Sequence, residues 1–156
     1  MRLFLARHGN TFGPSDPVVW AGSSNDFELV ESGREQAHRL ADRLKVNRIS
    51  LHAIYCSPLK RTRNFAAIVG EKVSPESPIQ VDARLNEIDY GSWSGRSNQQ
   101  VEELGFAEEQ RLWVKSSTWP RGANWSSSPE QIISEVTTFS DELIVRYPQQ
   151  SILCVS

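Results

Sequence analysis

Three short, continuously apolar runs constrain the fold of this chain more than any other feature. They lie at residues 3–6, 53–56 and 151–155. Continuous rather than alternating apolar sequence is typical of strands that are buried on both faces of a parallel sheet. A shorter run at residues 79–81 predicts one more strand. Such a sheet needs covering helices, because neither of its faces can stay exposed to water.

The segments between these runs carry apolar residues at helical spacing. One helix is expected to open at Ser32, where Glu35 three residues later predicts a capping box. A second is expected over residues 59–69, and a third after Pro129, since proline suits the first turn of a helix. The alternation of strands and helices predicts an α/β fold, a three-layer α/β/α sandwich with a mostly parallel central sheet.

Length and charge exclude several classes of protein. The chain has 156 residues and a net charge of −2, from 17 basic and 19 acidic residues. A single domain over residues 1–156 suits this length, and the charge offers no basic field for nucleic acid. The first apolar run is too short for a signal peptide, and nothing approaches a membrane span. The three histidines and two cysteines do not fall at zinc-ligand spacings. We therefore expect a cytoplasmic protein without a metal, a nucleic-acid partner or a membrane partner.

The first strand breaks directly into Arg7-His8-Gly9-Asn10-Thr11. A lone histidine is more often a packed core residue, but an arginine beside it fits badly in an apolar core. Gly9 allows close approach of the backbone, and the two residues after it add side-chain donors. In parallel sheets, ligands bind outside the carboxyl ends of the strands. The stretch therefore predicts an anion pocket that contains a nucleophile.

A second arginine is expected in the same pocket. Arg61 lies just after the second strand, at the start of a predicted helix whose N-terminus adds partial positive charge. Arginine forks match the oxygens of a phosphoryl group, whose transfer requires mainly positioning and charge stabilisation.

RHGNT, SPLKR and LNEIDYGSWSG, in this order, resemble the motifs of the histidine phosphatase superfamily, the phosphoglycerate-mutase-like enzymes. The resemblance implies a metal-independent phosphomonoesterase with no cofactor, which acts on a small phosphorylated metabolite and binds inorganic phosphate. It implies that His8 becomes phosphorylated and that Glu87 protonates the leaving oxygen. The phosphate-binding residues it implies are Arg7, Arg61, Asn10 and Thr11. A homodimer stays open, and so do sugar phosphates, nucleotides and phosphoproteins as substrates.

The same resemblance leaves two further functions open. Mutases of the superfamily usually carry glutamate where this chain has Asn10, and an arginine that is missing from Asn86–Tyr90. We therefore expect hydrolysis, with a phosphoglycerate-mutase-type phosphotransferase as the alternative. The family's second histidine usually follows a strand like ILCVS, and the sequence reaches Ser156 one position short of it. We expect a C-terminal part to be missing; if the chain truly ended there, a phosphate-binding pseudoenzyme or interaction domain would be the alternative.

Residues 98–128 are expected to form a lid-like insertion over the site. Aromatic and basic residues alternate there, and the candidates for substrate contacts are Trp113, Trp119, Arg121 and Trp125. Many superfamily members carry Gly-Glu-Ser in this region, where this chain does not. Packing over the sheet is an equally weighted interpretation of these aromatic residues.

Overall fold

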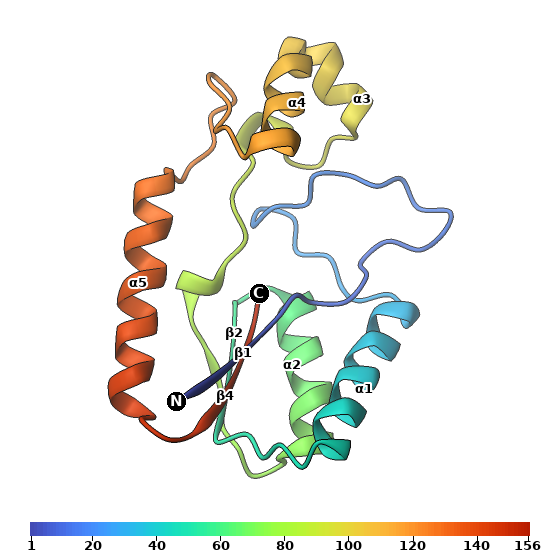
Figure 1. The fold of residues 1–156 in the computed structure, drawn as a ribbon. Helices are drawn as coiled ribbons and strands as arrows, with labels where there is room; N and C mark the ends of the chain where they lie inside the picture. The colour runs from blue at the N-terminus through green and yellow to red at the C-terminus, as the bar shows by residue number, and fades with distance from the viewer.

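A parallel sheet of four strands separates two layers of helices (Figure 1). The computed structural model describes residues 1–156. The strands are β1 (Arg2–Ala6), β2 (Ala53–Cys56), β3 (Ile79–Val81) and β4 (Ser151–Val155), in the order β1-β4-β2-β3. Every neighbouring pair is parallel. All four predicted strands are confirmed at their predicted positions.

The helices cover both faces of the sheet. The chain moves across the sheet in one direction through α1 (Glu31–Val46) and α2 (Lys60–Val73), and then returns from β3 to β4 through α5 (Pro129–Arg146). Because crossovers between parallel strands are right-handed, a reversal of direction places the returning helix on the opposite face. Figure 1 shows α5 on one side of the sheet and both α1 and α2 on the other. The predicted three-layer α/β/α sandwich is confirmed.

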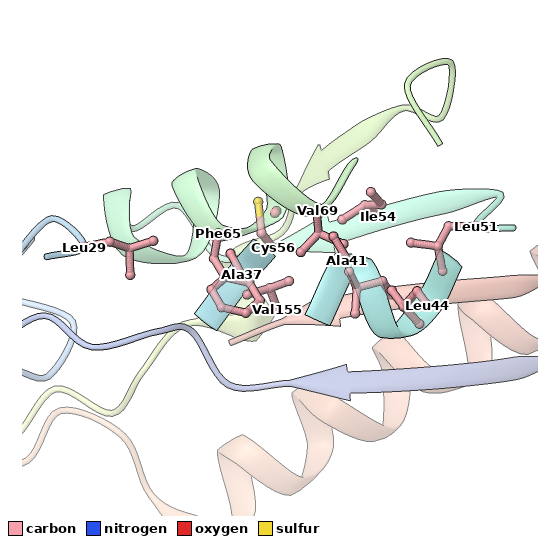
Figure 2. Packing of buried hydrophobic residues seen from close by; sticks show 12 residues of the cluster. Leu29, Ala37, Ala41, Leu44, Leu51, Ile54, Cys56, Phe65, Val69 and Val155 are labelled. Atoms are coloured by element: carbon pink, nitrogen blue, oxygen red, sulfur yellow. The ribbon is translucent and has the colours of Figure 1, made fainter. Parts of the chain in front are cut away.

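Two apolar clusters hold these layers together. The larger one packs α1 and α2 on the sheet, with Ala37, Ala41, Phe65 and Val69 against Val155 (Figure 2). The second lies between α5 and the other face of the sheet. Its buried members are Ala53, Tyr55, Phe139, Leu143, Tyr147, Ile152 and Cys154.

Two local expectations are wrong. The helix at Ser32 begins one residue earlier, after Val30, and no side chain caps it, so the predicted capping box does not form. Ser32 therefore lies inside the first turn, and its hydroxyl accepts a hydrogen bond from Asn10 Nδ2 at 3.4 Å. The strand β1 was expected to be buried, but Leu5 is 77% exposed. Within residues 1–156, β1 pairs with β4 alone.

The region between β3 and α5 contains more helix than its sequence indicated. Short turns at η1 (Ala83–Leu85) and η2 (Gly91–Trp93) precede α3 (Asn98–Val101), a π-helical turn η3 (Glu102–Phe106) and α4 (Ala107–Ser116). The sequence of α4, AEEQRLWVKS, is made largely of good helix formers. No helix of the protein is both long and apolar enough to cross a membrane.

Candidate active site

The carboxyl ends of the parallel strands meet at one edge of the sheet, and a cavity of about 760 Å³ lies there. His8 follows β1, Arg61 follows β2, and Glu87 follows β3. At the end of β4, Ser156 is bonded to the backbone of His8, whose N–H donates to its carbonyl at 2.9 Å. All six residues expected to catalyse or to bind phosphate line this cavity: Arg7, His8, Asn10, Thr11, Arg61 and Glu87.

The imidazole of His8 is held in one tautomer. Its Nδ1 donates to the carbonyl of Gly9 at 2.7 Å, while the Nε–H of Arg61 donates to its Nε2 at 3.1 Å. Nε2 therefore carries the lone pair, which is the form that a nucleophile needs. Burial lowers the pKa of His8 below its usual value; the Gly9 hydrogen bond opposes this, and the positive charges of Arg61 and Arg7 add to it. The ring is consequently neutral at neutral pH.

Arg61 is the most constrained side chain of the site. It is only 1% exposed. Besides its contact with His8, its two terminal nitrogens donate to the carbonyls of Asn25 and Gly22, at 2.9 and 2.8 Å. Arg61 therefore ties the candidate nucleophile to the loop between β1 and α1. The helix that carries Arg61 is fixed to the same loop, because Asp26 accepts the Lys60 backbone N–H at 2.7 Å.

Arg7 carries the same charge as Arg61, but its side chain is not held by other groups of the protein. Its side chain is exposed and makes no hydrogen bond or ion pair within the protein, yet it lines the same cavity. An unpaired guanidinium at the cavity wall is free to form a bidentate pair with an incoming anion. Thr11 is half-buried beside it and also has a free hydroxyl.

The backbone after His8 packs directly on the first turn of α1. A Cβ added to Gly9 would collide with the backbone of Gly33, and one added to Gly33 would collide with the backbone of Asn10. Asn10 is held further by Gln36, whose Oε1 accepts its backbone N–H at 2.7 Å. The two glycines therefore allow the close contact that positions His8. Gly9 therefore lines the cavity and is also required to be glycine by its contact with α1.

Glu87 has one engaged and one free oxygen. Its Oε1 accepts the backbone N–H of Ile88 at 3.1 Å and the hydroxyl of Tyr90 at 3.3 Å. No protein group donates to Oε2. Burial raises the pKa of Tyr90, with the negative charge of Glu87 adding to it, so this hydroxyl keeps its proton and acts as the donor. Oε2 is therefore the oxygen of Glu87 that is free to contact a ligand.

The rest of the cavity is an apolar wall that sequence reasoning missed. The loop between β1 and α1 supplies most of it, and the apolar lining residues are Phe12, Val18, Val19, Trp20, Ala21, Phe65 and Tyr90. Trp20 fixes this loop to the region before α4: its Nε1 donates to Asn98 Oδ1 at 2.9 Å, and its backbone N–H donates to Arg96 at 2.9 Å. Figure 1 shows the loop, in blue, running between the sheet and the α3–α4 region. No local periodicity marks these residues.

The aromatic residues expected over the site occupy another environment. Trp113, Trp119 and Trp125 pack edge-to-face with centroid separations of 4.9 to 5.5 Å, and Trp125 also contacts Tyr90 at 4.9 Å. None of the three lines the cavity, and neither does the exposed Arg121. From residues 98–128, only Asn98 reaches the cavity wall. The tryptophans therefore pack on one another and on Tyr90, and the cluster that contains Trp113 and Trp125 includes no residue of the sheet.

The chain contains no group of three or more His, Cys, Asp or Glu side chains placed to hold a metal ion. The site is thus built from a neutral histidine, two guanidiniums and one carboxyl group.

A family model described as the histidine phosphatase superfamily, branch 1, matches residues 3–156. The chain belongs to this superfamily. A relative named phosphoserine phosphatase 1, from Hydrogenobacter thermophilus, is 32% identical to this chain over 158 residues. The alignment covers 100% of this chain and 70% of the relative. A 2,3-bisphosphoglycerate-dependent phosphoglycerate mutase from Arthrobacter is 34% identical, but over 76% of this chain and 48% of the mutase. The superfamily relatives therefore include both phosphatases and mutases.

Solved structures of the superfamily share the fold. A mycobacterial glucosyl-3-phosphoglycerate phosphatase in complex with inorganic phosphate superposes with a TM-score of 0.79 at 25% identity, covering 99% of this chain and 72% of that one. The chain thus spans about 70% of its full-coverage relatives and about half of the mutase it matches.

Proposed function

We propose that this chain is a phosphomonoesterase that works through a phosphohistidine on His8. The observation that supports this most directly is the Nε2 lone pair of His8, which lies 3.1 Å from the Arg61 guanidinium in a cavity that also contains Arg7 and Glu87. A neutral nucleophile beside one fixed and one free guanidinium is suited to attack a phosphoryl group.

In the first step, Nε2 gives up its hydrogen bond from Arg61 and forms a bond to phosphorus, the Arg61 Nε–H turns to a phosphoryl oxygen, and the bond from phosphorus to the ester oxygen breaks. The two arginines stabilise the charge that spreads over the equatorial oxygens. Glu87 donates its proton to the leaving oxygen, so that the alcohol departs neutral and Glu87 becomes a carboxylate. The Nδ1–H bond to Gly9 holds the ring and stabilises its positive charge in the phosphohistidine.

In the second step, water attacks the phosphohistidine. The Glu87 carboxylate takes a proton from this water as its oxygen bonds to phosphorus, and the bond from phosphorus to Nε2 breaks. Inorganic phosphate leaves, His8 returns to its neutral form, and Glu87 is again protonated. One carboxyl group thus serves as acid and then as base, as microscopic reversibility allows.

Two features favour water over a second substrate as the acceptor. Asn10 stands where mutases of the superfamily carry glutamate. Two relatives that align over the whole chain are named as phosphatases, whereas the mutase aligns over three quarters of it.

The test is to trap the intermediate. The purified protein is mixed with a ³²P-labelled phosphomonoester, quenched within one turnover, and assayed for phosphate bound in acid-labile form. We expect labelled wild-type protein and no label on His8→Ala, with turnover reduced roughly a thousandfold or more. His38→Ala, which changes an exposed histidine on α1, is the matched control and should label normally.

Other outcomes separate the alternatives. Normal hydrolysis by His8→Ala would overturn the proposal. Transfer of the label from the protein to phosphoglycerate faster than to water would identify a mutase. Phosphate that raises the melting temperature without any labelling or turnover would identify a phosphate-binding protein.

A further inference from the structure

We infer that the substrate's leaving group is a neutral and largely apolar alcohol. This inference rests on the proposed phosphatase function and specifies which phosphomonoesters fit the same cavity. It comes from two observations on the cavity wall: the number of charged groups that line it, and the position of its apolar side chains.

The residues of this chain that line the cavity supply two guanidiniums, which suffice to pair with one phosphoryl group. Of its 17 lining residues, only Arg7, Arg61 and Glu87 carry a full charge when His8 is neutral. Both guanidiniums belong to the end that contains His8, so phosphate uses them. The one remaining ionisable group, Glu87, is the proton donor and supplies no positive charge. A carboxylate on the leaving group would therefore meet no further cation among these residues.

Basic residues near the cavity do not alter this count. Lys60 precedes Arg61, but its ammonium group lies 3.9 Å from a Glu28 carboxylate oxygen and does not line the cavity. Arg96 is bonded to the carbonyl of Ser92 at 2.6 Å and is likewise absent from the lining. Neither is placed to bind a second anionic group of the substrate.

The neutral polar groups of the wall are largely occupied by the protein itself. Gln36 bonds through both ends of its amide with Asn10, at 2.7 and 3.3 Å. The Oδ1 of Asn98 accepts from Trp20 and also from Gln110, at 2.9 and 3.1 Å. A polar leaving group would lose water here and gain few hydrogen bonds, which costs binding free energy.

Apolar side chains fill the remaining surface. Phe12, Val18, Val19 and Trp20 come from the loop between β1 and α1, and all four line the cavity. Val18 is 68% exposed, so a hydrocarbon group that covers it would remove apolar surface from water. The wall therefore favours aryl or alkyl groups over acids, amino acids and sugars.

Three alkyl monoesters of similar intrinsic reactivity test this inference. Benzyl phosphate is neutral and apolar beyond its phosphate, glycerol 3-phosphate is neutral and polar, and 3-phosphoglycerate adds a carboxylate to the glycerol frame. We expect kcat/KM to fall in this order, with benzyl phosphate preferred over 3-phosphoglycerate by about tenfold or more. Equal rates, or a preference for 3-phosphoglycerate, would overturn the inference.

A binding measurement separates failure of this inference from failure of the proposed function. Isothermal titration calorimetry of the same three esters, under conditions without turnover, gives their Kd values. If the protein hydrolyses none of them, the proposed function fails, and the order of Kd values still decides the inference. Equal affinities for benzyl phosphate and 3-phosphoglycerate would refute it even in an active enzyme.

A positive charge placed on the cavity wall should change the preference between glycerol 3-phosphate and 3-phosphoglycerate. Val18→Lys supplies the missing cation, and Val18→Met adds length without charge. We expect V18K to raise kcat/KM for 3-phosphoglycerate relative to glycerol 3-phosphate by roughly three- to tenfold, with the gain disappearing at high salt. V18M should keep the wild-type order. No change in the V18K ratio would show that the wall does not contact the leaving group.

Discussion

The two ends of the cavity are constructed in opposite ways. At the end formed by the strands, Arg61 is 1% exposed and its donors already have acceptors on His8, Gly22 and Asn25. At the loop end, the apolar side chain of Val18 is 68% exposed. Arg61 at the strand end is therefore held in place before any ligand arrives, whereas the apolar wall has exposed surface that a ligand would cover.

This difference separates the chemistry from the choice of substrate. A preorganised cluster of charges lowers the barrier of a step without a cost for rearrangement at the moment of reaction. An open apolar wall contributes in proportion to the area that it removes from water. Changes to the buried, hydrogen-bonded residues of the strand end should therefore affect both stability and turnover, while changes at the wall should affect selectivity.

The largest effect is expected for Arg61→Ala. It removes one of the two positive charges and leaves the carbonyls of Gly22 and Asn25 without their donor. We expect kcat/KM to fall about a hundredfold or more and the free energy of unfolding to fall by roughly 2–4 kcal/mol. Urea denaturation and steady-state kinetics measure the two losses separately.

Arg7→Ala is the matched control for this prediction. It removes the same charge from an exposed side chain that has no partner in the protein. Turnover should again fall about a hundredfold, but the free energy of unfolding should change by no more than about 0.5 kcal/mol. If both variants lost equal stability, the contrast between a rigid and an open position would be wrong.

The next effect concerns the contact between α1 and the segment after His8. Gly33→Ala places a methyl group against the backbone of Asn10, which cannot move without moving His8. We expect the free energy of unfolding to fall by roughly 2–3 kcal/mol, with a loss of turnover because the nucleophile shifts. Gly13→Ala, where an added Cβ meets only the side chain of Asp16, should cost no more than about 0.5 kcal/mol.

The rigid end is also the part of the site that the sequence predicted well. Strand ends of a parallel sheet lie together, so RHGNT and SPLKR could be placed in one pocket from short apolar runs alone. The same reasoning failed where long-range contacts decide the geometry. Trp20 and Asn98 are 78 residues apart in sequence and are joined by one hydrogen bond. No periodicity in a single sequence indicates such a pair.

Local signals also misled at two places. The serine and glutamate near the start of α1 fit a capping box, but the helix begins at Glu31 because its first turn packs on Asn10, whose carbonyl accepts the Val30 backbone N–H at 3.0 Å. The alternating composition around Trp113 left two interpretations equally open, a lid over the site and packing over the sheet. The tryptophan rings pack on one another instead, at centroid separations near 5 Å. Reading AEEQRL as helix formers would have predicted α4.

A smaller effect is expected for Tyr90→Phe, which removes the hydroxyl that positions Glu87 and leaves the ring in its aromatic cluster. Glu87 then keeps a single hydrogen bond on Oε1, from Ile88, and is less well oriented. We expect kcat/KM for benzyl phosphate to fall about three- to tenfold. The loss should be smaller for 4-nitrophenyl phosphate, whose leaving group needs little protonation.

Glu87→Gln gives the reference for that comparison. It removes the acid itself and should show the same dependence on the leaving group with a larger loss, roughly a hundredfold or more for benzyl phosphate. If Tyr90→Phe slowed both esters equally, its hydroxyl would serve the shape of the cavity rather than the proton donor.

The smallest effect is expected in the pH dependence of stability, and it concerns His8. Burial, together with the two arginines, lowers the pKa of His8 in the folded protein below its unfolded value of about 6.5. The unfolded chain therefore binds this proton more readily, so the contribution of His8 is fully present above about pH 6.5 and is lost as the pH falls through the folded pKa. The difference in unfolding free energy between wild type and His8→Ala should shrink or reverse over that window. Turnover should persist below pH 6.5 for the same reason, because Nε2 keeps its lone pair there. Stability curves at matched pH values that ran parallel for wild type and His8→Ala would show that the ring is not held neutral by its surroundings.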